Sequence, residues 1–145
     1  NLDTMVISDF VPFKNLNFMP WAMTAHVLYK EIDKDKPATI SVKVIKMIRS
    51  DIGFDGVLLS DDLSMKALDG SLKNRTACAL AAGCDVALHC NGEMMEMIQV
   101  ASGGVPLSNQ AIKRIERAEK LRLNNRTPID GTFDDHIQRL EEMMI

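Results

Sequence analysis

The sequence predicts an α/β fold in which parallel strands alternate with helices. Three short apolar runs, at 21–25, 57–59 and 85–90, are too brief for helices, and each one ends at polar residues. The segments between them carry apolar residues at helical spacing or are rich in alanine. Strands that alternate with helices in this way are typical of parallel βα units.

The first of these strands follows a short predicted helix. We expect that helix over 9–17, with Ser8 or Asp9 as its N-cap. The strand at 21–25 follows it, and the charged, proline-containing segment 29–39 is expected to be a loop.

A second helix leads into the middle strand. Ser41 is a good N-cap residue, and Gly53 is a good C′ residue. Between them the apolar residues recur at helical spacing: Val44, Ile45, Met47, Ile48 and Ile52.

The second half of the chain is mostly helical. Further helices are predicted over 72–82, 93–101, 108–123 and, more weakly, 134–144. Gly83 is expected to end the first of these, and 124–131 is expected to be a loop. We therefore divide the chain into an α/β part, 1–123, and a helical extension or tail, 124–145.

The composition is that of an ordinary globular protein. The chain has 145 residues, of which 46% are hydrophobic and 26% charged, and its net charge is −3. This charge gives no electrostatic reason to expect nucleic acid or an anionic membrane as a partner. No apolar run is long enough to span a bilayer, and the first residues lack the pattern of a signal peptide.

The sulfur-containing residues are expected to be structural. Cys78, Cys84 and Cys90 form no C-x-x-C pair and lie in apolar surroundings, which predicts reduced, buried thiols. The ten methionines, including Met94 and Met95, are expected to fill the core.

Three strands are few for a parallel sheet. Such a sheet has two open edges and is poorly covered, whereas a TIM barrel needs eight βα units. Either the chain is part of a longer protein, or another copy completes the sheet.

Polar residues follow all three strands. They are His26, the adjacent pair Asp61 and Asp62, and His89 with Asn91. Since the carboxyl ends of parallel strands lie at one edge of a sheet, we expect these groups to converge there. The two aspartates should point to opposite faces. Either carboxylate could be a nucleophile, a general base or a metal ligand, or it could only cap the following turn.

Competing interpretations remain for the other polar groups. His26 could contact a substrate or could hydrogen-bond to its own loop, and His89 is expected to be buried with its hydrogen bonds satisfied. The spacing of histidines, cysteines and acids matches no metal site, and no glycine-rich phosphate loop is present. The mixed charges of 113–122 are expected to form a solvated helix face.

The run from Gly53 to Met65, GFDGVLLSDDLSM, closely resembles a stretch of the bacterial β-N-acetylglucosaminidases of glycoside hydrolase family 3. Other segments that resemble this family occur in the expected order and spacing: Asp9–Phe13, Met23–Tyr29, Pro37–Thr39 with Ser41, Ala82–Asp85, and Cys90–Asn91. The resemblance covers about residues 9–122.

The resemblance implies the C-terminal part of a TIM-barrel glycosidase. Enzymes of this type are cytoplasmic, need no metal or other cofactor, and remove N-acetylglucosamine from the non-reducing end of muropeptides in peptidoglycan recycling. Asp61 corresponds to the nucleophile of the retaining reaction. Asp62 would support the turn, Ser64 would shape the pocket, and Met23 and His26 match positions near the sugar.

The chain also departs from the family. The family's general acid, a histidine paired with an aspartate on a mobile loop, lies upstream of the position equivalent to Asn1, and neither His26 nor His89 replaces it. We therefore expect a fragment that carries the nucleophile without the acid, is nearly inactive alone, and pairs with the missing part of the barrel or another copy. A truncated, non-catalytic product that self-associates or binds a partner is the alternative. A different reaction at Asp61 is the third possibility.

Overall fold

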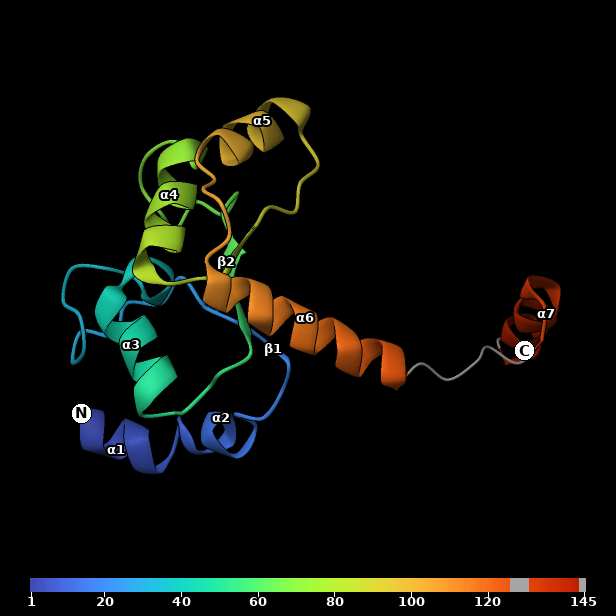
Figure 1. Ribbon diagram of the computed structural model, residues 1–145, viewed down its shortest axis with the longest axis horizontal. Coiled ribbons are helices and arrows are strands. Elements are labelled where there is room, and N and C mark those ends of the chain that lie inside the picture. The colour runs from blue at the N-terminus through green and yellow to red at the C-terminus, as the bar shows by residue number, and fades with distance from the viewer. Residues whose placement is uncertain (126–130, 144–145) are drawn as a thin grey trace.

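The computed structural model describes residues 1–125 and 131–143. Its centre is a parallel sheet in the order β1 (Trp21–Met23), β2 (Val57–Asp62), β3 (Val86–Leu88). Helices connect the strands, as the sequence predicted (Figure 1). The sheet does not close on itself within the described residues, as expected for part of a barrel.

The helices of the described residues are α1 (Leu2–Ile7), α2 (Val11–Asn15), the 3₁₀ helix η1 (Ala38–Ile40), α3 (Val42–Ser50), α4 (Leu72–Ala82), α5 (Met94–Ser102), α6 (Asn109–Asn124) and α7 (Phe133–Met143). In Figure 1, α7 lies apart from the α/β body. The prediction of a last helix is thus confirmed up to Met143, while Met144 and most of the preceding loop lie outside the described residues. The boundary at residue 123 stays a prediction.

The two faces of the sheet differ. Met23 on β1 lies opposite Leu59 on β2, so the alternation of side chains puts Met23, Leu59 and Asp61 on one face. Leu58 and Ser60 belong to the other face, where Leu58 packs in a core of residues from α3 and α4. We call the side that bears Met23 and Asp61 the open face.

The start of the chain differs from the prediction. The helix expected over 9–17 is the shorter α2, and a helix that was not predicted, α1, precedes it with a break at 8–10. Neither Ser8 nor Asp9 caps α2, whose N-cap is Phe10 without a side-chain hydrogen bond. The Ser8 hydroxyl instead donates to a carbonyl within α1. Pro12 explains the break, because proline fits only the first turn of a helix.

Ser41 is the N-cap of α3, as predicted. Its hydroxyl oxygen accepts a hydrogen bond from the Val44 amide at 3.2 Å, and the hydroxyl donates to the buried Asp33 carboxylate at 2.6 Å. The predicted helix end was too late, because the C-cap is Asp51 and Gly53 lies beyond C′. Gly53 has a φ of 77° and turns the chain toward β2.

The helix that follows β2 ends as predicted. Gly83 is the left-handed C-cap of α4, with a φ of 114°. A side chain at this position would approach Ile45 of α3, so the glycine also permits close packing of the two helices. Its neighbour Cys84 belongs to the same core.

A network of buried charges stands at the amino end of the sheet. The Asp85 carboxylate accepts hydrogen bonds from the Leu58 amide at 2.9 Å, from Arg49 at 2.7 Å and from Arg114 at 3.0 Å. Arg114 also binds Asp55, at the entry to β2. These contacts join α3, α6 and two strands.

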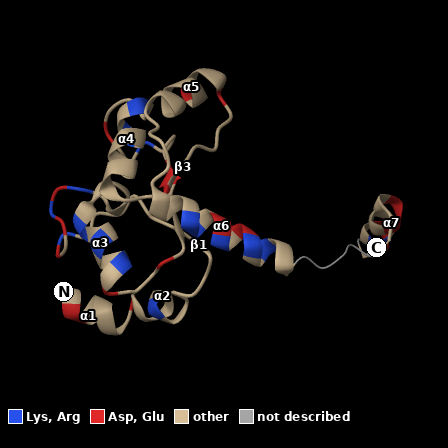
Figure 2. Ribbon diagram, viewed as in Figure 1, with Lys and Arg blue, Asp and Glu red and all other residues tan. Residues whose placement is uncertain are grey.

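This network corrects the prediction for 113–122. Figure 2 shows acidic and basic positions along α6, and we expected all of them to face solvent. Arg114 is instead largely buried, because it reaches the carboxylates of Asp55 and Asp85. Arg117 contacts Asp55 as well. The sequence did not reveal these pairs, because their members lie far apart along the chain.

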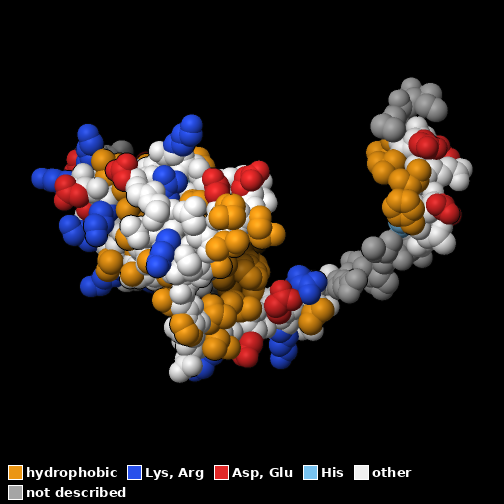
Figure 3. Space-filling model, turned by 90° about the horizontal axis from the view of Figure 1, so that it is seen from above, with side chains coloured by type: hydrophobic (Ala, Val, Ile, Leu, Met, Phe, Trp, Pro, Cys, Tyr) orange, Lys and Arg blue, Asp and Glu red, His pale blue; other side chains and the backbone are white. Residues whose placement is uncertain are grey.

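The predictions for sulfur-containing residues were partly wrong. All three cysteines are free, but only Cys84 is buried, and its burial raises the pKa of the thiol to about 12. Cys78 and Cys90 are exposed, since they lie on the outer side of α4 and in the loop after β3. Met94 and Met95 on α5 are also exposed and fill no core. Figure 3 shows hydrophobic side chains gathered on one side of the α/β body.

Candidate active site

The middle strand ends at Asp61 and Asp62, and the two carboxylates have different surroundings. Oδ1 of Asp61 accepts a hydrogen bond from the Asp62 amide at 2.8 Å. Within the part of the chain that the structure describes, Oδ2 of Asp61 has no hydrogen-bond partner. Asp61 is half-buried and lies on the open face. One of its oxygens is therefore anchored, while the other is available to a ligand.

Asp62 holds the turn together. Its Oδ1 accepts from the amides of Ser64 at 3.0 Å and Cys90 at 3.2 Å, and its Oδ2 accepts from the Ser64 hydroxyl at 2.6 Å. Burial opposes ionisation of this carboxyl, but these hydrogen bonds and the nearby His89 lower its pKa on balance. Although Cys90 is exposed, partial loss of hydration of its thiol and the negative charges of Asp62 and Asp61 raise its pKa.

The Ser60 side chain replaces a missing backbone hydrogen bond between β2 and β3 just before the two aspartates. The register between β2 and β3 shifts between Leu59 and Asp62. The Leu88 amide there donates to the hydroxyl of the fully buried Ser60 at 2.9 Å, and the Leu63 amide donates to the Leu88 carbonyl at 2.9 Å. These bonds keep the strand end attached to β3 where the regular ladder is interrupted.

His26 lies beside the same strand end, but both of its nitrogens already have partners. Nδ1 is 2.9 Å from the Thr39 hydroxyl, and Nε2 is 2.9 Å from the Asp62 carbonyl oxygen. The Thr39 hydroxyl is 2.9 Å from that of Thr24, which accepts from the Asp61 amide at 3.1 Å. The bond to Thr39 corresponds to the alternative in which the ring binds its own loop.

The other predicted site residues are less constrained. Met23 is 53% exposed on the open face, next to Leu59 and two residues along from Asp61 in the sheet register. Ser64 is half-buried in the loop after β2, with its hydroxyl committed to Asp62. The structure thus brings Met23 to the face that bears Asp61. The substrate-binding roles of Met23, His26 and Ser64 stay predictions.

The His89 side chain is buried, as predicted, and its Nε2 has a hydrogen-bond partner. Its side chain is 6% exposed, and Nε2 is 2.9 Å from a Glu96 carboxylate oxygen. The hydrogen bonds from His89 and Asn91 lower the pKa of Glu96. These contacts attach α5 to the end of β3. They do not bring His89 into contact with Asp61.

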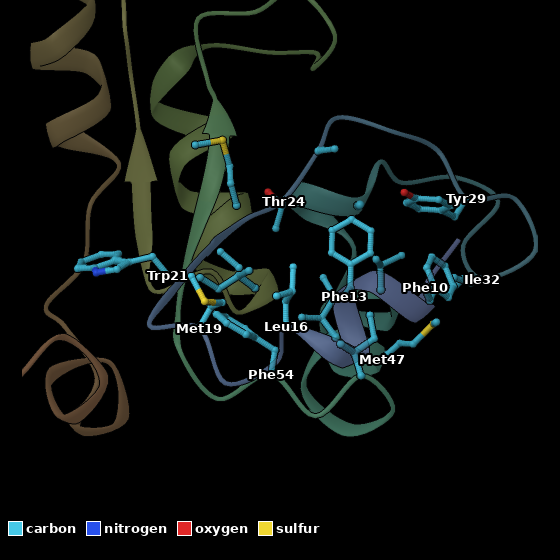
Figure 4. A pocket seen from close by; sticks show the side chains of 18 residues that line it. Phe10, Phe13, Leu16, Met19, Trp21, Thr24, Tyr29, Ile32, Met47 and Phe54 are labelled. Atoms are coloured by element: carbon cyan, nitrogen blue, oxygen red, sulfur yellow. The ribbon is translucent and has the colours of Figure 1, made fainter. Parts of the chain in front are cut away.

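An apolar pocket in the described residues has neither aspartate in its lining. It has a volume of about 420 Å³ and lies between α2, α3 and β1. Figure 4 shows Phe13 of α2 pointing into it, with Phe10, Met47 and Phe54 around it. Its lining contains no acid, histidine or cysteine. We interpret it as an incompletely packed space between the helices and the sheet.

Two further features are absent from the described residues. No group of three or more histidine, cysteine or acidic side chains is arranged to hold a metal ion there. None of the described helices combines the length and the apolar character needed to cross a membrane.

A comparison with known families identifies this arrangement. Residues 4–121 match the glycosyl hydrolase family 3 N-terminal domain. The chain belongs to this family. It is 42% identical over 96 residues to a β-hexosaminidase of Neisseria gonorrhoeae, covering 63% of this chain and 26% of that protein. It is 39% identical over 113 residues to one of Chromobacterium violaceum, covering 75% and 32% respectively.

Solved structures of the family have the same fold. NagZ from N. gonorrhoeae in complex with N-trifluoroacetyl-D-glucosamine matches with a TM-score of 0.69 and 31% identity, over 88% of this chain and 39% of that one. The β-N-acetylglucosaminidase from Thermotoga maritima matches with a TM-score of 0.63 and 27% identity, over 87% and 30%. The prediction of a partial TIM barrel from this family is therefore confirmed. The chain spans about a quarter to a third of these curated relatives.

Sequence reasoning missed two buried residues of the site. Thr24 and Thr39 connect His26 to the Asp61 backbone, yet neither was singled out. The sequence does offer one indication for Thr24, because it is a polar residue within the apolar strand at 21–25 and lies two residues before His26. Thr39 carries no such signal.

Proposed function

We propose that the protein to which this chain corresponds is a retaining exo-β-N-acetylglucosaminidase with Asp61 as its nucleophile. The observation that carries this proposal is the position of Asp61 at the carboxyl end of the middle strand of a family 3 barrel. Ligands and reacting groups of parallel α/β folds are found at such strand ends. Oδ1 is held by the Asp62 amide, and Oδ2 lies free on the open face.

The reaction begins with attack by the free oxygen. Oδ2 of Asp61 forms a bond to the anomeric carbon, and the bond from that carbon to the leaving-group oxygen breaks with its electron pair. A carboxylate held at about 3 Å from the reacting carbon also stabilises the positive charge that develops there. Water then hydrolyses the glycosyl ester and restores the carboxylate.

The neighbours of Asp61 have supporting roles in this proposal. Asp62 holds the loop through Ser64, and the loop forms one wall of the sugar site. Met23 supplies an apolar surface on the open face beside the nucleophile. No metal or other cofactor takes part.

The 145 residues contain no counterpart of the family's general acid. A natural glycoside needs a proton on its leaving oxygen, so we propose that this chain alone hydrolyses such substrates hardly at all. The amino-terminal part of the barrel is the partner that would supply the acid and close the sheet. From the resemblance of 53–65, the substrate is a muropeptide that carries N-acetylglucosamine, and the reaction occurs in the cytoplasm.

Complementation tests this function. The full chain is refolded with the part of the N. gonorrhoeae β-hexosaminidase that precedes the matched segment, and hydrolysis of a fluorogenic N-acetylglucosaminide is followed. We expect hydrolysis by the mixture, none by either part, and its loss with Asp61→Asn. Asp51→Asn is the matched control, because Asp51 is exposed at the end of α3.

Three results would contradict the proposal. Rapid turnover by the chain alone would disprove the need for the rest of the barrel. An active mixture that tolerates Asp61→Asn would disprove the assigned nucleophile. A mixture that folds and stays inactive would count against the function itself.

The exposed apolar surface supports a second candidate, a non-catalytic product that associates with itself. Trp21 and Met23 on the edge strand are 39% and 53% exposed, and Met94 and Met95 on α5 are more exposed still. Open strand edges with exposed apolar residues favour association. Light scattering after gel filtration decides: a defined dimer that persists on dilution supports this candidate, and a monomer contradicts it.

A further inference from the structure

We propose that Thr24, Thr39 and His26 form a directed chain of hydrogen bonds that positions the Asp61 carboxylate for attack. The inference rests on the proposed function, since it concerns the same nucleophile. It makes His26 a positioning residue and not a group that binds the sugar. The observation behind it is that the chain begins at the Asp61 amide and returns to the Asp62 carbonyl.

The donors and acceptors in this chain have one consistent arrangement. The Asp62 carbonyl can only accept, so Nε2 of His26 carries the proton. In a neutral ring Nδ1 must then accept, and Thr39 donates to it. The Thr39 oxygen accepts from the Thr24 hydroxyl, and the Thr24 oxygen accepts from the Asp61 amide. Each hydroxyl thus gives one hydrogen bond and receives one.

A doubly protonated ring does not fit this arrangement. Nδ1 would become a donor, so the Thr39 hydroxyl would have to turn toward Thr24. The Thr24 hydroxyl would then lose its acceptor within the chain, since the Asp61 amide is itself a donor. The chain in which Thr24 donates to Thr39 therefore requires a proton on Nε2 of His26 and an accepting Nδ1.

Burial makes the arrangement rigid. Thr39 is 0% exposed and Thr24 is 6% exposed, so water does not compete for their hydroxyls. A hydroxyl that loses its partner in such a place carries an uncompensated desolvation cost. The chain therefore resists reorganisation at any one of its members.

The chain fixes the backbone on both sides of the nucleophile. The Asp61 amide belongs to the peptide group that joins Ser60 to Asp61. The Asp62 carbonyl belongs to the peptide group that joins Asp62 to Leu63. Between them, the Asp62 amide holds Oδ1 of Asp61 at 2.8 Å. With these groups fixed, Oδ2 has a defined position on the open face. Positioning of this kind matters, because a shift of about 1 Å can slow a reaction on the order of 100-fold.

The test uses the full chain and a 5-fluoro N-acetylglucosaminide with a dinitrophenolate leaving group. Formation of the Asp61 adduct needs no acid, because dinitrophenolate leaves as the anion. Intact-mass spectrometry gives the adduct rate and its dependence on donor concentration. Nuclear magnetic resonance gives the tautomer of His26 and the exchange rate of the Asp61 amide.

The informative variant is Thr39→Val, which removes the hydroxyl and keeps the shape. We expect the maximal adduct rate to fall, and Asp61 amide exchange to rise, at least about tenfold, with the half-saturating donor concentration changed less than about threefold. Thr39→Ser keeps the hydroxyl and should restore both. Thr76→Val is the control, because Thr76 is equally buried but bonds only within α4.

The outcomes distinguish the positioning role of the hydrogen-bond chain from the assignment of Asp61 as the nucleophile. A wild-type adduct on Asp61 that Thr39→Val leaves unchanged contradicts the positioning role and leaves the nucleophile intact. Equal slowing by Thr76→Val, or a His26 ring protonated on Nδ1, also contradicts the positioning role. A wild-type chain that forms no adduct, either alone or refolded with the amino-terminal part of the barrel, while His26 carries its proton on Nε2 as expected, contradicts the proposed function and the catalytic role of the hydrogen-bond chain together.

Discussion

Replacing Asp85 with asparagine should destabilise the protein more than any other change of a single charge. The Asp85 carboxylate is nearly inaccessible, and it accepts from two arginines and one strand amide. The substitution keeps the shape but turns one acceptor oxygen into a donor that faces other donors. It also leaves Arg49 and Arg114, whose side chains are 18% and 14% exposed, without their shared partner.

The expected loss follows from that burial. Removing one member of a buried ion pair costs about 3–5 kcal/mol. Because both arginines keep some hydration, we expect Asp85→Asn to lower the free energy of unfolding by about 3 kcal/mol. With a urea slope of about 2 kcal/mol per molar, the unfolding midpoint should fall by about 1.5 M. Whole domains are stable by only about 5–15 kcal/mol, so the change is large.

Urea unfolding at 25 °C and neutral pH measures this loss by far-ultraviolet circular dichroism. Fluorescence of the single tryptophan, Trp21, provides a second probe of two-state behaviour. Asp55→Asn is the matched control: its side chain is 56% exposed and pairs with Arg114 and Arg117, so it should cost about 1 kcal/mol or less. Asp85→Asn costing no more than Asp55→Asn would refute the structural role of the buried network.

Three further effects should be measurable by the same method. Ser41→Ala removes the N-cap of α3 and should lower the free energy of unfolding by about 1–2 kcal/mol. Ser71→Ala removes the exposed N-cap of α4 and is the control; a larger loss there than in Ser41→Ala would contradict this prediction. The hydrogen bond from Ser41 lowers the pKa of the Asp33 carboxyl in the folded protein. The ionised Asp33 therefore contributes its full stabilisation above the unfolded pKa of about 3.9, and this stabilisation is lost as the pH falls through the lower folded pKa. As the pH is lowered below about 4, the urea midpoint should therefore decrease, and it should decrease less steeply in Ser41→Ala. Identical pH profiles for the two proteins would contradict this prediction. Gly83→Ala should cost about 1–2 kcal/mol, since φ is 114° and the new Cβ would lie 3.0 Å from Ile45; an unchanged midpoint would contradict this.

The local features of the fold could be predicted from the sequence because they depend on neighbouring residues. The run at 57–59 is apolar and follows Gly56, which predicts a buried strand. Ser41 and Gly83 have the cap chemistry that helix ends require, and both act as caps. Asp61 could be placed at a strand end for the same reason.

Features that depend on distant residues could not be predicted in this way. Arg114 is buried because Asp85 and Asp55 lie beside it, and no local pattern reveals those partners. Thr24 and Thr39 are fifteen positions apart and meet only after η1 packs beside the sheet. Exposure of Met94 and Met95 also follows from the arrangement of whole elements and not from the apolar character of α5.

The most direct test of the catalytic assignment is to locate the glycosyl adduct by peptide mass spectrometry. The full chain is treated with the 5-fluoro dinitrophenyl N-acetylglucosaminide and digested. We expect one sugar residue, ester-linked to Asp61, and no adduct in Asp61→Asn. An adduct on Asp62, an equal yield in Asp61→Asn, or no adduct on the wild-type chain even after refolding with the amino-terminal part of the barrel would contradict the assignment of Asp61 as the nucleophile.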